Sequence, residues 1–367
     1  MKKNLFATTA IVAAFGFGAS AAQAQDASLS LSAFSSFYAN VVDQDNPPVT
    51  GGNPYADTDY DFSTNTEVEV NGEVTLDNGI TAGMSVEFEA DNADGVGARD
   101  NVDENLIYLS GSFGRVEFGH EDGPADVMRY GATSIKAVFP GGYNNTTGTF
   151  INHSGNAPTA TVLSDSSDGQ KVTYFTPRFA GIQAGISLAP DSSQADFPFS
   201  GAATTRNATQ DHFEGGINYV NSFNGFDLAV SLTGDYVATP ANRNLPGSSD
   251  PYHVALGAVL GFGGFEFGGA AAMGETNVDD ELQAYDLGVA YSTGPWSVSL
   301  TGIYSQFEQD ATGNEDDFME GQLGVNYALG SGVSVFATGT VGEHDTEVAG
   351  STDNDYVSLL SGVGVSF

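Results

Sequence analysis

The stretch from Thr66 to Asp91 alternates between apolar and charged residues. From Val68 to Ala90 most even positions are apolar, whereas glutamates occupy many of the odd positions. Apolar side chains at every second residue are typical of a β-strand with one apolar and one polar face. Asp77-Asn78-Gly79 interrupts the run and predicts a hairpin turn, because glycine readily adopts positive φ.

The same alternation fixes the pairing of the two strands. If all apolar positions share one face, Glu69 lies opposite Glu87 and Glu67 lies opposite Glu89. Directly opposed like charges each destabilise a sheet by up to about 1 kcal/mol unless water surrounds them. We therefore expect these four glutamates to line a surface that is in contact with water. The apolar face, roughly ten residues long, suits a tilted strand that crosses a bilayer, although a β-sandwich shows the same alternation.

Similar segments occur along the whole chain and decide between these two folds. Short turns and long polar stretches alternate between them, which is the pattern of an outer-membrane barrel. Glycine is frequent within the strands, as in 254–274, and would let a closed sheet bend. We predict an all-β, 16-stranded antiparallel transmembrane barrel, a single domain over 25–367, with short periplasmic turns and long external loops. The predicted strands are 27–40, 66–76, 80–90, 104–111, 115–120, 170–176, 180–189, 212–219, 226–236, 252–260, 265–273, 282–292, 296–307, 318–329, 333–344 and 355–367.

The first residues have the features of an export signal. Lys2 and Lys3 precede a short apolar stretch, and Ala22-Gln23-Ala24 provides a small-residue cleavage site. These features predict a secretory signal peptide over 1–24. No later run of about 18 apolar residues predicts a membrane helix. An exported β-rich chain of this kind is expected in the outer membrane of a Gram-negative bacterium.

The composition narrows the function. The chain has 47 Asp and Glu residues against 10 Lys and Arg, a formal net charge of −37, and no cysteine. This charge excludes nucleic acid as a partner, and the lack of cysteine excludes disulfides, thiol catalysis and iron–sulfur clusters. Carboxylates on the water-facing positions predict a pore that prefers cations and small hydrophilic solutes. Besides the four glutamates above, they are Glu73, Asp91, Glu214, Asp227, Asp235, Glu266, Asp286 and Glu320.

Three motifs carry a resemblance to a known family. They are GSFGRVEFGHEDGPAD at 111–126, VTYFTPRFAGIQAGISL at 172–188 and the terminal VGVSF at 363–367. The chain resembles a general diffusion porin of Gram-negative outer membranes, of the alphaproteobacterial type. The resemblance implies a homotrimer surrounded by outer-membrane lipid, and a third loop that folds into the barrel. It also implies that the barrel-assembly machinery reads the terminal Phe367.

The third loop, 121–169, is far longer than the roughly 12 to 15 residues usual for a loop without structure of its own. In the family, acids on this loop face basic residues on the barrel wall. The resemblance therefore implies a pore constriction formed here by Glu121, Asp122, Asp126, Arg115 and Lys171.

Two positions depart from the family pattern at this constriction. His120 and Phe175 stand where the family often has arginine, so the wall carries little basic charge. The alternation would point His120 outward with Phe118, unless the strand ends or bulges there. Arg115 and Lys171 have the alternation expected of lumen-facing residues.

Other functions have less support in the sequence. We predict no cofactor, although the acidic stretches 91–104 and 309–318 offer oxygen ligands for Ca²⁺ without the spacing of a known calcium loop. The five histidines lack metal-binding spacing and no nucleophile elbow is present, so we expect no enzyme activity. An outer-membrane hydrolase is therefore the weakest alternative. A channel selective for sugars or organic solutes stays open, and inward aromatics at Phe175, Phe336 and Tyr356 would support it.

Overall fold

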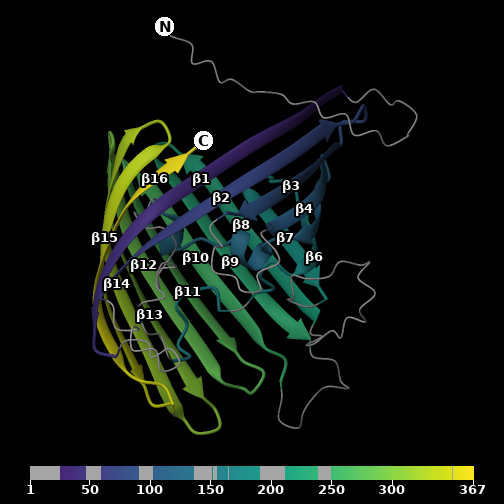
Figure 1. The fold of residues 1–367 in the computed structure, drawn as a ribbon. Coiled ribbons are helices and arrows are strands. Elements are labelled where there is room, and N and C mark those ends of the chain that lie inside the picture. The colour runs from purple at the N-terminus through teal and green to yellow at the C-terminus, as the bar shows by residue number, and fades with distance from the viewer. Residues whose placement is uncertain are drawn as a thin grey trace.

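The computed structural model describes residues 25–46, 59–90, 102–135, 151, 155–163, 165–190, 211–238, 249–348 and 350–367. Within these ranges sixteen antiparallel strands form one closed barrel, in which each strand pairs with its neighbours in sequence (Figure 1). The predicted fold is therefore confirmed. The predicted signal peptide lies outside the described residues. The strands are β1 (Gln25–Gln44), β2 (Tyr60–Thr75), β3 (Thr81–Glu89), β4 (Val102–Gly111), β5 (Gly114–His120), β6 (Gln170–Phe175), β7 (Ile182–Ala189), β8 (Asp211–Phe223), β9 (Phe226–Ala238), β10 (Tyr252–Phe262), β11 (Phe265–Glu275), β12 (Glu281–Thr293), β13 (Trp296–Gln309), β14 (Asn314–Gly330), β15 (Val333–Thr346) and β16 (Asn354–Ser366).

The hairpin of β2 and β3 has the predicted register. Glu67 lies opposite Glu89, and Glu69 lies opposite Glu87. Gly79 closes the turn with φ +79° and donates its N–H to the carbonyl of Leu76 at 2.9 Å. The turn residues and the apolar alternation therefore agree on one pairing, as a specified register requires.

Several strands extend beyond the segments predicted from alternation. β14 begins at Asn314 rather than Phe318, and β1 continues to Gln44 rather than Asn40. The apolar pattern marks only the part of a strand that needs an apolar face. Backbone pairing continues past it, because main-chain hydrogen bonds do not depend on side-chain polarity.

The two ends of the chain close the barrel. β1 pairs with β16 from Phe34 opposite Ser366 to Gln44 opposite Tyr356. The N–H of Phe367 adds a further bond of 2.9 Å to the carbonyl of Ala33. Closure leaves no unpaired strand edge, which is the condition for a sheet to span a bilayer.

The outer face has an apolar band between two belts of aromatic side chains. At the long-loop end the belt comprises Tyr236, Tyr252, Tyr285 and Tyr304, all exposed. At the short-turn end it comprises Phe223, Phe226, Phe262, Phe265, Phe267, Tyr291 and Trp296, with ring centroids of Phe265 and Tyr291 4.5 Å apart. Such belts mark the two membrane interfaces of a barrel. Among the described residues no helix is both long and apolar enough to cross a membrane.

Candidate functional site

The third loop begins at a break in strand alternation. Phe118 points outward and is 45% exposed, but His120, two residues later, is only 9% exposed. Gly119 between them has φ +152°, which breaks the alternation of side chains although the pairing with β4 continues to His120. His120 acts electrostatically on Asp168 of the third loop. The side chain of His120 is therefore turned away from the lipid, as a break in the alternation at this position would require.

From this break the loop folds into the barrel. A short helix, α1 (Pro124–Val127), contacts β7, β8 and β9, and a 3₁₀ turn, η1 (Ala132–Ser134), contacts β11 and β12. Ala132 packs with Ile303 and Phe318, which are inward-facing residues of β13 and β14. The described part of the third loop therefore lies inside the barrel and follows its inner wall, as expected.

Glycines on the inner wall make room for this loop. A Cβ on Gly257 would overlap the carbonyl oxygen of Tyr130, and one on Gly268 would overlap that of Gly131. A Cβ on Gly216 would crowd the carbonyl of Pro124. Our prediction gave bending as the reason for the glycine-rich strands. At these three positions glycine is explained better by the close approach of the loop backbone, which leaves no space for a Cβ.

Three inward carboxylates bind the loop backbone. Glu214 of β8 accepts hydrogen bonds from the N–H groups of Ala125 at 3.1 Å and Ser166 at 3.0 Å. Asp286 of β12 accepts from the N–H of Ala132 at 2.7 Å and from the hydroxyl of Thr161 at 2.7 Å. Both carboxylates are at most 5% exposed. Hydrogen bonds to a charged acceptor are worth about 1.5–3 kcal/mol each, so they fix the path of the loop.

Asp316 of β14 is the third of these carboxylates. It accepts a hydrogen bond from the N–H of Asn156 at 2.7 Å and another from the hydroxyl of Thr346. The wall also holds the loop through neutral groups, since Ser231 accepts from the N–H of Tyr130 at 2.8 Å. The anchors lie on β8, β9, β12 and β14, so the loop is held on the side of the barrel opposite β2 and β3.

These contacts change the role assigned to several acids. Glu214, Asp235, Asp286 and Glu320 were predicted to line open water, but each is 5% exposed or less. Glu320 instead accepts a hydrogen bond from the hydroxyl of Tyr356. Strand alternation assigned the correct face to each residue, but it gives no information on what covers that face.

Glu67, Glu69, Glu87 and Glu89 of β2 and β3 are only half-buried, and Glu73 of β2 is exposed. Glu69 accepts hydrogen bonds from Ser32 at 3.0 Å and Ser85 at 3.1 Å. Glu73 accepts one from Tyr108 at 2.8 Å. Together with Glu67, Glu87 and Glu89, they form an acidic wall on this side of the lumen.

The basic side chains near the loop are already engaged. Arg115 pairs with Glu117 and lies 3.6 Å above the ring of Tyr108. Lys171, 5% exposed, donates to the backbone carbonyls of Glu121 and Ser167. Arg129 is paired with Asp126 at 2.6 Å. Arg115 and Lys171 were predicted at the constriction, and that role stays a prediction; Arg129 was not among the predicted constriction residues.

Acidic side chains of the third loop are partly buried and lie near other carboxylates. Burial raises the pKa of Glu121 to about 8, with further contributions from Glu117 and Glu104. Burial also raises the pKa of Asp122 to about 7, and the charges of Asp126 and Asp168 add to the effect. The third loop therefore has carboxyl groups whose pKa values lie near neutral pH.

A histidine cluster was not predicted. His253 lies 2.9 Å from Asp235, and His212 lies 3.4 Å from the other oxygen of the same carboxylate. These residues lie on three neighbouring strands, so spacing along the chain does not show the cluster. Among the described residues no group of three or more acidic or histidine side chains is placed to hold a metal ion. The stretch 91–104, which offers oxygen ligands for Ca²⁺, lies largely outside the described residues, and the absence of a cofactor stays a prediction.

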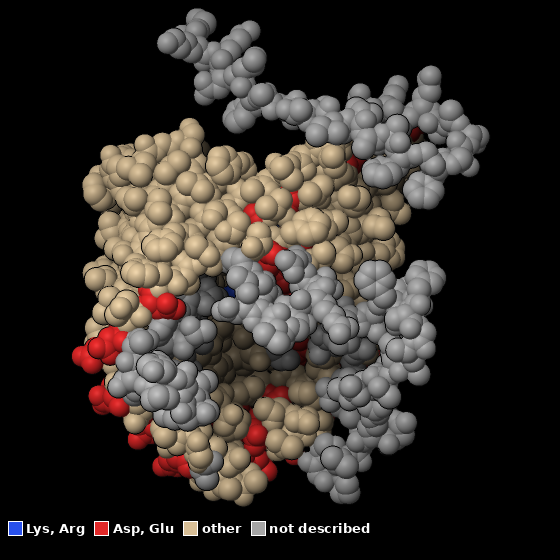
Figure 2. All heavy atoms as spheres, in the orientation of Figure 1, with Lys and Arg blue, Asp and Glu red and all other residues tan. Residues whose placement is uncertain are grey.

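Acidic side chains are prominent in the space-filling view. Figure 2 shows a hollow into the barrel with acidic groups around it, and more of them along the lower left rim. The surface above this rim is largely uncharged. The lumen and its long-loop entrance therefore present negative charge to an approaching ion.

Comparison with known proteins gives both a family and related structures. The model of the Gram-negative porin family matches residues 7–347. The chain is similar to an anion-selective porin from Comamonas acidovorans, with 18% identity, a TM-score of 0.62 and coverage of 93% of this chain and 100% of that one. No curated protein matches significantly.

Two further structures have the same fold. The trimer form of OmpT, an outer-membrane protein of Vibrio cholerae, is 16% identical with a TM-score of 0.62, over 94% of this chain and 100% of that one. A mutant of the Rh. blastica porin is 16% identical with a TM-score of 0.56, over 92% and 100%. At these identities the likeness shows the fold.

Proposed function

Because the chain belongs to the Gram-negative porin family, we propose that its outer-membrane channel passes cations and small hydrophilic solutes in preference to anions. The multi-pass barrel itself follows from the family and the closed sheet. The preference for cations is argued from the side chains of the lumen. Family and fold point to a channel rather than an enzyme.

The engagement of the basic side chains carries this proposal. The described residues include four Lys or Arg side chains, and three of them, Arg115, Arg129 and Lys171, lie near acids of the third loop. Each is bound to a carboxylate or to backbone carbonyls. An anion in the lumen must compete with these partners, whereas a cation meets the acidic wall of β2 and β3.

The relative from Comamonas acidovorans is an anion-selective porin, so the fold accommodates either sign of selectivity. The difference must then arise from lumen side chains and not from the barrel. In this chain the acids of the lumen far outnumber the bases, which favours cations.

The sugar-selective alternative gains no support from Tyr356, one of the three inward aromatics. Tyr356 is 3% exposed, packs against Val42 and Ile151, and donates its hydroxyl to Glu320. A solute in the lumen therefore cannot stack on this ring. Phe175 lies next to Met128 of the third loop, since both crowd the position where Gly185 would carry a Cβ.

The proposal extends to the assembly of the channel. OmpT of Vibrio cholerae forms a trimer, and we propose the same copy number here. The side chain of Phe367 is 89% exposed at the end of the closing strand, where the barrel-assembly machinery can bind it. Outer-membrane lipid covers the apolar band between the aromatic belts.

Conductance in planar bilayers tests the function directly. In a KCl gradient the purified protein should give a reversal potential of the sign set by K⁺ movement. Current should close in three equal steps if the active unit is a trimer. A reversal potential of the opposite sign contradicts the charge argument but leaves the channel assignment intact, whereas absence of conductance contradicts the channel itself.

A further inference from the structure

The outer face of the barrel has a hollow of about 1160 Å³ over β11 to β16. Gly302 of β13 lies directly opposite Gly321 of β14, so the floor of the hollow has no side chains there. Exposed apolar side chains surround it, namely Leu287, Leu300, Met319, Val341 and Val357. Most of its wall is therefore apolar and faces the bilayer.

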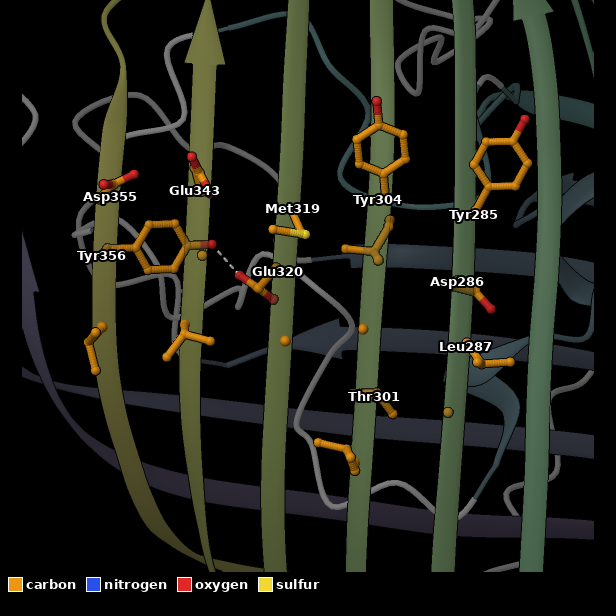
Figure 3. Close-up of a pocket in the computed structure, with 18 of the residues that line it drawn as sticks. Tyr285, Asp286, Leu287, Thr301, Tyr304, Met319, Glu320, Glu343, Asp355 and Tyr356 are labelled. Carbon is orange, nitrogen blue, oxygen red and sulfur yellow. Dashed lines mark hydrogen bonds between the residues drawn. The ribbon is translucent and has the colours of Figure 1, made fainter.

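One end of the hollow is acidic. Asp43, Asp45, Glu343 and Asp355 line it, and all four are exposed. In Figure 3 the labelled Asp355 and Glu343 lie toward the same end of the wall as the hydroxyls of Tyr285 and Tyr304, with Leu287 well below them. This is the long-loop end, where the aromatic belt places the membrane interface.

These acids lack cationic partners in the neighbouring strands. Glu343 lies directly opposite Asp355, and their charges repel each other. After Arg243 the sequence contains no Lys or Arg, so β10 to β16 have no side chain with a permanent positive charge. Opposed like charges destabilise a sheet, and a cation from outside the chain would relieve this repulsion.

We propose that this hollow binds a membrane lipid whose headgroup carries an ammonium group. The acyl chain lies over Gly302 and Gly321 among the surrounding apolar side chains. The ammonium group lies between Glu343 and Asp355, within reach of Asp43. Burial of apolar surface and charge complementarity then act on two ends of the same molecule.

The charge of the chain disfavours a second copy as the occupant. Two copies that met through this face would bring their acidic rims together, and the formal net charge is −37. A metal ion alone would leave the apolar hollow unfilled, and the described residues hold no group of three or more ligands placed for one. A lipid whose headgroup carries an ammonium group fits both ends.

Native mass spectrometry of the full-length mature protein in detergent tests the site. Phosphatidylethanolamine and phosphatidylglycerol with identical acyl chains serve as probes, each with and without Ca²⁺. We expect phosphatidylethanolamine to stay bound and phosphatidylglycerol to bind on the order of tenfold less.

Two variants separate the contributions of the two ends. Gly321→Leu fills the hollow, and a Cβ there meets its neighbours only at ordinary van der Waals distances of 3.9–4.0 Å. Glu343→Gln with Asp355→Asn removes the charge without changing shape. Each should lower phosphatidylethanolamine binding on the order of tenfold. Gly339→Leu is the matched control, because Gly339 lies on β15 outside the hollow, a Cβ there meets nothing within 4 Å, and binding should not change.

Three results would overturn the proposal. The first is equal binding of the two lipids, and the second is phosphatidylglycerol binding that requires Ca²⁺, which would indicate a bridged anionic headgroup. The third is a wild-type oligomer that carries no bound lipid, together with a Gly321→Leu variant that no longer forms the oligomer. This result would indicate that a second copy of the chain occupies the hollow. Should Gly321→Leu fail to fold, the exposed charge variant still decides, because its substitutions are isosteric.

Discussion

The carboxylate of Asp286, on the wall of the barrel, lies 2.7 Å from the backbone nitrogen of Ala132 in the third loop. The two residues are far apart in sequence, yet this contact and its counterparts at Glu214 and Asp316 determine where the loop lies. The width of the pore at the loop therefore depends on carboxylates that no permeating ion needs to touch.

Asp286→Ala removes the acceptor for both Ala132 and Thr161. We expect about 1.5–3 kcal/mol of lost loop stabilisation per bond, a mobile loop and noisier open-channel current. Single-channel recordings check this. Asp227→Ala is the control, because Asp227 faces the lumen near the short turns and is exposed. Equal current noise in the two variants would show that Asp286 does not hold the loop.

Gly257→Val tests the space that the wall gives the loop. Its Cβ would overlap the carbonyl oxygen of Tyr130, and the added methyl groups enlarge the overlap. We expect the loop to shift and the conductance to change, at a cost of about 1–3 kcal/mol in stability. Gly339→Val should leave both unchanged, since a Cβ there meets nothing. Thermal unfolding and conductance, measured together, distinguish a moved loop from a misfolded barrel.

The acidic wall can be neutralised without changing its shape. Replacing Glu67, Glu69, Glu87 and Glu89 by glutamine should lower the cation-to-anion permeability ratio several-fold, because these side chains supply much of the uncovered negative charge. Reversal potentials in a KCl gradient measure the ratio. Glu343→Gln on the outer face removes a charge outside the lumen and should leave the ratio as it was. If Glu343→Gln has the larger effect, selectivity is set at the outer rim of the barrel.

The sequence predicted the strands because their signals are local. The β2–β3 register followed from alternation and one turn, and both are encoded within a few residues of Asn78. The same reasoning across the short turn after β8 would have placed Glu214 opposite Asp235.

Pairing across a long loop is different. β9 and β10 are joined by 239–251, which does not set a register, so the contact of Asp235 with His253 was not foreseeable. The anchors of the third loop were missed for a related reason. Their partners are backbone N–H groups, such as that of Ala125, which every residue except proline has and which leave no pattern in the sequence.

Selectivity should also depend on pH, through Glu121 and Asp122 of the third loop. Burial raises their pKa values to about 8 and about 7, so both carboxyls are mainly ionised at pH 9 and mainly neutral at pH 6. Because raised pKa values mean that protons bind as the pH falls through this range, the constriction loses negative charge between about pH 9 and about pH 6. The cation-to-anion permeability ratio should therefore fall over this interval.

The double variant Glu121→Gln with Asp122→Asn isolates this contribution. These amides do not titrate, so the variant should have the lower ratio at every pH and a flatter profile between pH 6 and pH 9. His212→Gln is the comparison, because that histidine lies beside Asp235 and outside the loop. Reversal potentials recorded across the range measure both. A profile that stays steep in the double variant but flattens in His212→Gln would assign the pH dependence to the histidine cluster instead.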